Sequence, residues 1–280
     1  MEHVRSLIAG AVRSRVAGPG AADRHRELFE TDGPRWFVPG SPIWRVHGDV
    51  AMFVGGLRAV LLQSLHPLAM AGVAQHSDYR ADPWGRLQRT ADFLAATTFG
   101  TEEQSRKACA RVRAVHKRVR GTASDGRPYD ANDPHLLRWV HVAEVDSFLA
   151  AHDRFGERRL GPRDRDRYVA DMARIAEELG VPDPPRTVAA LRRTLGAYRH
   201  ELAGTPEARE AARFLLAPPI PAVAIGPYAV LGAAAVGLLP TWARGPLALP
   251  WLPLTERFAV RPAGQALVGA LRWALTPAAA

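Results

Sequence analysis

The chain has 280 residues, which is long enough for one large domain or two small ones to bury most of their apolar surface without a disulfide or a structural metal. Hydrophobic residues make up 47% of it and charged residues 23%, a balance that excludes a disordered, a collagen-like or a polytopic membrane protein. The net charge of +9 comes almost entirely from arginine, because Lys107 and Lys117 are the only lysines. The arginines are scattered and form no block, so we expect a solvated basic surface and no nucleic-acid partner.

The chain contains a single cysteine, Cys109. One thiol excludes an internal disulfide framework, a Cys-rich zinc site, an iron–sulfur cluster and covalent c-type haem attachment, and it favours a reducing compartment. Near the N-terminus, the apolar run 7–12 is too short for the core of a secretory signal and leads directly into Arg13. We therefore expect a cytoplasmic protein.

The first half of the chain predicts helices separated by turns. Residues 1–48 mix polar and apolar positions, and we expect one helix there, followed by an irregular arm. Between Ala51 and Gln75 the only charged residue is Arg58, and apolar positions recur at helical spacing, which predicts a buried helix disturbed by Pro67.

Apolar spacing and capping residues predict six further helices, at 86–99, 102–120, 133–151, 164–179, 186–202 and 206–216. We expect Gly121 to end the second of these and a polar loop, 122–132, to follow it. Hairpin signals of the Asn-Gly type and long alternating runs are not found, so the sequence predicts an all-α, single-domain helical bundle.

The segment 215–243 contains no charged residue. Its length alone would allow a membrane span, but five prolines in it would leave backbone groups unpaired in hydrocarbon. We expect a hairpin packed on the core. The alternative is shallow contact with a membrane surface, supported by Trp242, Trp251 and nearby arginines.

The familiar phosphate-binding and serine-hydrolase motifs do not occur, which leaves histidine as the residue type that could carry chemistry. His141 lies four residues from both Leu137 and Val145, so its ring shares the apolar face of its helix. It could satisfy a buried carbonyl there or bind a cofactor. His116 lies three residues after Arg113 on one side of another helix, which places an imidazole beside a guanidinium.

Two cofactor sites are compatible with these histidines. The first is a mononuclear non-haem metal held by His116, His141 and Glu144. The second is a non-covalent haem in a helical pocket, with His141 as the axial imidazole and Arg113 and His116 on the opposite side.

Several short motifs in a fixed order resemble those of the MpaB-like oxygenase family, which includes the bacterial rubber oxygenases, or latex-clearing proteins. The motifs lie at 62–67, 71–80, 82–87, 89–90, 98–101, 112–121, 139–141, 146–147, 179–182, 238–240 and 249–251. The resemblance covers about residues 45–255 and is densest in the first half. It therefore implies a catalytic domain at 45–255, preceded by an N-terminal helix and arm at 1–44 and followed by a C-terminal helix and tail at 256–280.

The resemblance implies a globin-like core that binds haem b and cleaves carbon–carbon double bonds of isoprenoid chains with O2. On this basis His141 resembles the proximal iron ligand, and Arg113, with His116 beside it, resembles the distal group that acts on bound oxygen. Rubber oxygenases carry a distal lysine and threonine, whereas this chain has His116 and Lys117 at the neighbouring positions. This departure argues against rubber itself as the substrate and leaves the coordination number of the resting iron open.

Arg86, Arg89 and Arg138 are candidate partners of the haem propionates, since arginine pairs well with carboxylates. His66 and His76 belong to the most extensive motif but receive no role, and structural hydrogen bonding is the simplest explanation for them. The sequence thus predicts an iron-containing haem dioxygenase that acts on an apolar, isoprenoid or lipid-like small molecule. The alternatives are a non-haem iron oxygenase and a non-catalytic membrane-surface or haem-carrying module.

Overall fold

A computed structural model describes residue 10, residue 18 and residues 20–276. The first half of the chain forms helices α2 (Ala21–Glu30), α3 (Pro42–His47), α4 (Met52–Gln63), α5 (Pro67–His76), α6 (Pro83–Phe99) and α7 (Glu102–His116) and strands β1 (Arg120–Thr122) and β2 (Pro128–Asp130). The second half forms α8 (Pro134–Phe155), α9 (Pro162–Leu179), α10 (Val188–Ala197), α11 (Pro206–Leu216), α12 (Ala222–Leu238), α13 (Thr241–Arg244), α14 (Pro253–Thr255) and α15 (Arg261–Leu275). A 3-10 turn, Tyr198–His200, follows α10, and a π-helical turn, Glu256–Val260, precedes α15.

These helices and the single short hairpin confirm the all-α prediction. The globin-like arrangement and the domain boundaries stay predictions. Most of the expected N-terminal helix and the last four residues of the expected tail lie outside the described residues. The expected helix 51–75 is two helices, the expected helix 102–120 ends at His116, and the expected irregular arm contains α2 and α3. Pro67 is the first residue of α5, and the path of the chain bends by 107° between α4 and α5.

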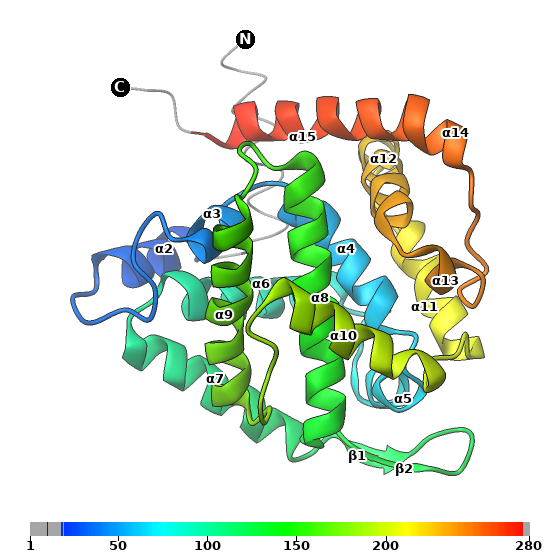
Figure 1. Cartoon of the computed structure of the whole chain (residues 1–280), viewed down its shortest axis with the longest axis horizontal. Helices are drawn as coiled ribbons and strands as arrows, with labels where there is room; N and C mark the ends of the chain where they lie inside the picture. The colour runs from blue at the N-terminus through cyan, green and yellow to red at the C-terminus, as the bar shows by residue number, and fades with distance from the viewer. Residues whose placement is uncertain (1–9, 11–17, 19, 277–280) are drawn as a thin grey trace.

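Helix α8 is the centre of the molecule (Figure 1), with α9 beside it and α15 across its C-terminal end. It begins at a good capping sequence, because the Asp133 carboxylate accepts a hydrogen bond of 2.8 Å from the His135 backbone and Pro134 occupies the first turn. Trp139, Val142 and Val145 are fully buried and form the core together with Leu61 and Leu62 of α4 and other apolar residues. The fold thus holds the middle of α8 in a rigid apolar environment.

The close packing of α4 on α8 depends on Gly55. A Cβ added there would lie 3.1 Å from Cδ1 of Phe148 and 3.2 Å from Cβ of Ala151. We expect Gly55→Leu to destabilise the fold by about 1–3 kcal/mol, because the added side chain must push two helices apart. Gly56→Ala is the matched control, since its Cβ would meet nothing within 4 Å.

The Gly56→Ala control is expected to stabilise the protein by up to about 1 kcal/mol, because alanine is the better helix former. Urea unfolding of both variants checks the pair. If Gly55→Leu were as stable as the wild-type protein, α4 and α8 could move apart without a loss of folding free energy.

The predicted helix 102–120 and the predicted loop after it are wrong in detail. Helix α7 ends at His116, and β1 and β2 form an antiparallel hairpin in which Gly121 pairs with Tyr129. A Cβ at Gly121 would lie 2.6 Å from the Tyr129 hydroxyl, so only glycine allows this approach. The turn carries Asp125-Gly126, with Gly126 at a φ of +84°, and Asp-Gly is a hairpin signal that the sequence analysis overlooked.

The uncharged segment 215–243 forms α12 and most of α13. The C-terminal half of α12 is buried at Ala234 and Ala235 against α4 and α15, whereas Val223 in its first turn is 87% exposed. Within the described residues, no single helix is both long and apolar enough to cross a membrane; α4 and α5 satisfy that test only as a pair, across their bend.

Candidate functional site

The most unusual side chain of the core is His141, in the middle of α8. It is only 7% exposed, and its Nε2 has no hydrogen-bond partner among the described residues. Burial lowers the pKa of His141 to about 4, so the imidazole is neutral at physiological pH. A neutral imidazole with a free nitrogen lone pair in a dry environment is the form of histidine that binds a metal.

A second acid–base group, Glu144, is partly buried and lies one turn further along the same face of α8. Burial raises the pKa of Glu144 to about 7. Tyr168 of α9 is fully buried, and burial, together with the charges of Glu144 and Asp171, raises its pKa. The carboxyl and phenol groups are therefore close enough to interact electrostatically, and both favour their protonated forms.

Polar contacts continue from Tyr168 to helices α3 and α6. The Tyr168 hydroxyl lies 3.3 Å from Nε2 of His47, and Nδ1 of the same ring lies 2.7 Å from the Thr98 hydroxyl. The His47 ring also packs edge-on against Phe148 of α8. Three helices thus place a polar chain beside the face of α8 that carries Glu144.

The partly buried His47 predicts an acid-sensitive fold. Burial lowers the pKa of His47 to about 3, whereas an unfolded histidine titrates near 6.5. Between these pH values the unfolded chain binds a proton that the folded chain does not, so stability falls as the pH falls. We expect His47→Gln to abolish about 2 kcal/mol of the stability that the wild-type protein loses between pH 7 and pH 5.

Urea unfolding at the two pH values measures this difference. His25→Gln, at an exposed position of α2, is the control and should leave the pH dependence unchanged. An identical loss of stability in His47→Gln and wild type would mean that His47 is protonated in the folded protein.

The structure separates the two predicted distal residues. Nη1 of Arg113 donates to the backbone carbonyl of Glu178 and lies 3.4 Å from its Oε1. His116 is half-buried; burial lowers its pKa, and the Asp130 carboxylate and the Ala131 backbone oppose that shift. Arg113 therefore faces α9, whereas His116 faces the end of the hairpin.

Arg113 nevertheless lies near the face of α8 that carries His141. It lines an open pocket of about 530 Å³ together with Leu137 of α8 and Leu179 of α9. Leu137 is one turn before His141 and packs on Ala176 of α9. The pocket thus connects the predicted distal arginine with the helix turn next to the predicted iron ligand.

The three predicted propionate partners have protein partners of their own. Arg86 donates to the Ser77 hydroxyl, and burial lowers the Arg86 pKa. Arg89 is exposed and lies 3.3 Å from the Asp82 carboxylate. Arg138 donates to the Pro182 carbonyl, while its Nε is buried without a partner in the described part of the chain. Their role towards a propionate stays a prediction.

The structure does not support the alternative non-haem site. Within the described ranges, the ligand atoms of His116, His141 and Glu144 do not gather within 4.8 Å of one another. The physical reason is their placement, since His116 is at the C-terminal end of α7 beside the hairpin and the other two are in the middle of α8.

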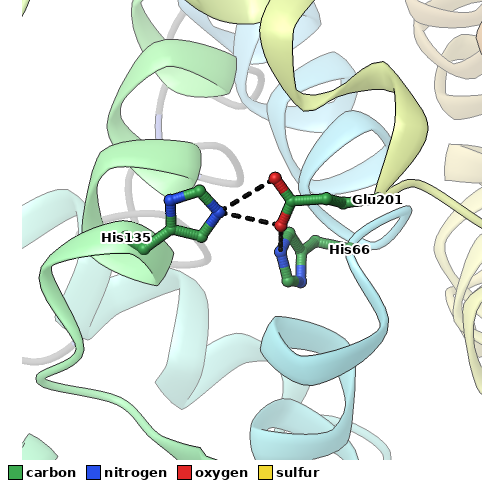
Figure 2. A group of neighbouring side chains, drawn as sticks. All are labelled: His66, His135 and Glu201. Carbon is green, nitrogen blue, oxygen red and sulfur yellow. Dashed lines mark hydrogen bonds and ion pairs between the residues drawn. The ribbon is translucent and has the colours of Figure 1, made fainter.

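Three other residues do come together (Figure 2), namely His66, His135 and Glu201. No sequence pattern pointed to a role for His66, and none singled out His135 or Glu201. These residues lie in three distant segments of the chain, so no spacing within one helix could have identified them. The presence of His66 in the most extensive motif was the one available signal.

Comparison with known proteins gives two relatives and a family. The chain is 30% identical over 182 residues to an uncharacterized protein of Mycobacterium tuberculosis, Rv2237, and equally to its Mycobacterium bovis counterpart, Mb2261; each match covers 62% of this chain and 70% of the relative. No solved structure matches the chain. The family model described as ER-bound oxygenase mpaB/B'/Rubber oxygenase, catalytic domain, matches residues 44–273. The chain therefore belongs to this oxygenase family, which confirms the resemblance seen in its motifs.

Proposed function

We propose that this oxygenase-family protein is a haem b-dependent dioxygenase with His141 as the axial ligand of the iron. The observation that carries the proposal is the buried Nε2 of His141, which lacks a hydrogen-bond partner among the described residues. An unsatisfied polar atom in a core costs free energy, and coordination to iron would remove that cost. Bound haem would supply the chemistry of dioxygen activation.

The residues around His141 would control water and charge. Burial of His141 and of neighbouring core residues keeps water away, and a low dielectric strengthens every interaction with a developing charge. We propose Arg113 as the cation that stabilises negative charge on oxygen. Glu178 engages Nη1 of Arg113, and a guanidinium has five N–H donors in total, so Arg113 can hold an anion while it remains on Glu178.

The proposed substrate is an apolar alkene of isoprenoid or lipid-like structure. In the overall reaction, one C=C bond and one O2 molecule give two C=O groups, so no other reductant or oxidant is consumed. Family membership and the apolar Leu137 and Leu179 of the Arg113 pocket support this substrate class. We propose that His116, which interacts with Asp130 and with the Ala131 backbone, assists Arg113 in stabilising negative charge on oxygen.

The test is an absorption spectrum of the full chain expressed with a haem supply, followed by oxygen uptake with isoprenoid alkenes. We expect a Soret band and alkene-dependent oxygen consumption with carbonyl products. A colourless protein would contradict the haem assignment, and a haem protein that consumes no oxygen would favour a carrier.

Exposed apolar side chains favour peripheral contact with a membrane as a second property. They lie at Val223, Ile225, Trp251, Leu252, Leu254 and Phe258. Such residues bury in the headgroup region of a bilayer, and arginines nearby attract anionic lipid. Co-sedimentation with anionic vesicles tests this contact, and a protein that stays in the supernatant contradicts it.

A further inference from the structure

His66, His135 and Glu201 are brought together by three separate elements (Figure 2). His66 is the residue before the first turn of α5, His135 lies in the first turn of α8, and Glu201 follows the 3-10 turn after α10. Nε2 of His135 lies 3.0 and 2.8 Å from the two carboxylate oxygens of Glu201, and Nε2 of His66 lies 3.4 Å from the nearer one. Two imidazoles therefore converge on one carboxylate.

His66 is the part of this cluster that needs an explanation. It is 1% exposed, and neither of its ring nitrogens has a hydrogen bond of good geometry within the described part of the chain. The Glu201 carboxylate is 3.4 Å from Nε2, an ion-pair distance with poor hydrogen-bond geometry, and Nδ1 has no partner among the described residues. A network of protein groups alone thus leaves a buried imidazole unsatisfied, which is costly.

We propose that His66, His135 and Glu201 form a binding site for a divalent first-row transition metal of the zinc type. Two histidines and one carboxylate are a common ligand set for such ions. Ligand bonds of about 2.0–2.2 Å in tetrahedral geometry place ligand atoms about 3.4 Å apart. One ligand atom from each of the three side chains lies within 4.8 Å of the others, so small side-chain rotations complete the site.

The protonation states and surroundings suit a cation. His66 is 1% exposed, and a neutral imidazole has one ring nitrogen whose lone pair can bind a metal. The Glu201 side chain is 25% exposed, and its carboxylate would supply negative charge to a bound cation. Arg127 is the nearby cation, and it is exposed and paired with Asp125 at 2.7 Å.

Groups behind the ligands fix their orientation. The Tyr198 hydroxyl donates to the His135 carbonyl at 2.8 Å and lies 3.4 Å from Nδ1 of His135, which leaves Nε2 directed at Glu201. Such outer partners typically orient metal-binding histidines. Trp139 and Tyr198 flank the His66 ring. His135 has a side chain that is 50% exposed, so solvent or a small ligand can reach an open coordination position.

This site is distinct from the proposed haem site. His135 precedes His141 by six residues, which places the two side chains on different faces of α8. Metal binding at His66, His135 and Glu201 can therefore be measured without haem, and its failure would leave the assignment of His141 unaffected.

The experiment titrates chelator-treated, full-length protein with Zn²⁺ alone, in competition with a chromophoric chelator. We expect one saturable site of micromolar or tighter affinity in the wild-type protein. His135→Asn and Glu201→Gln alter partly exposed ligands and should fold, and each is expected to weaken binding by more than about tenfold. The test does not depend on a His66→Ala variant, because replacing this buried side chain could unfold the protein.

Thermal unfolding supplies a second readout. A roughly 100-fold excess of Zn²⁺ over the dissociation constant is expected to raise the unfolding temperature by about 5 °C in the wild-type protein but not in Glu201→Gln. A hydrogen-bonded network without metal would lose stability in Glu201→Gln and show no zinc dependence in either protein.

His200→Ala is the matched control. His200 is the chain neighbour of Glu201, but its side chain is 80% exposed and its Nε2 lies 3.8 Å from the carboxylate. We expect zinc affinity within about twofold of wild type, as for a residue that is not a ligand. No saturable zinc binding to wild type, undiminished binding in Glu201→Gln, or a loss in His200→Ala as large as in His135→Asn would overturn the proposal.

Discussion

Replacing His141 with alanine is expected to abolish haem retention while the protein remains folded. In the proposed function the imidazole would supply a coordinate bond between the chain and the iron, and the contacts of the porphyrin itself would be non-covalent and reversible. Its neutral form, with the pKa lowered to about 4, needs no proton release before it binds. The ratio of Soret to protein absorbance after gel filtration measures the loss.

Two variants on α8 and α7 separate iron ligation from other effects. His152→Ala removes another buried histidine of α8, whose Nδ1 has no partner among the described residues, and should retain haem. Arg113→Ala should retain haem as well but lower turnover by about 10²–10³, the usual cost of one charge-stabilising donor. Imidazole added to His141→Gly should restore a Soret band. Equal haem content in His141→Ala and wild type would place the ligand elsewhere.

The sequence predicted most helices because their signals are local. The Thr101 and Gln104 side chains form a capping box at the start of α7, and the Asp133 side chain caps α8, as the residue patterns indicate. The end of α7 was less predictable. Val119 leaves the helical path to pack in a cluster with Tyr129, a contact that depends on the hairpin and not on neighbouring residues.

The candidate sites show the same difference between local signals and contacts of distant segments. His141 was identifiable because its apolar neighbours recur at helical spacing on one helix. The chain from Tyr168 through His47 to Thr98 joins three helices, and no local pattern relates residues so far apart. The same holds for Glu201, which reaches His135 only because the segment after α10 folds over the start of α8.

The lone charge of α4 gives the second large prediction. Arg58 is 3% exposed and joins three helices. Its Nη2 lies 2.7 Å from the Asp146 carboxylate and its Nη1 donates to the Ser147 hydroxyl at 2.6 Å, both on α8. Its Nε donates to the Leu238 carbonyl at the end of α12 at 2.9 Å. Every side of the guanidinium thus has a partner, which is the condition for burying a charge.

We expect Arg58→Met to destabilise the fold by about 3–5 kcal/mol, because methionine fills much of the volume but leaves a carboxylate and a carbonyl unpaired. Urea unfolding measures the change. Arg106→Met is the control: Arg106 pairs with Glu102 on the exposed surface of α7, and such pairs contribute at most about 1 kcal/mol.

The double variant Arg58→Met/Asp146→Leu distinguishes the cost of an orphaned charge from the loss of an attraction. When both partners become apolar, no buried carboxylate remains, so the double variant should be more stable than Arg58→Met alone. If the double variant were instead less stable by the sum of the two single changes, the guanidinium and the carboxylate would act independently. The loss in Arg58→Met would then come from the contacts of Arg58 with Ser147 and Leu238, not from its ion pair with Asp146.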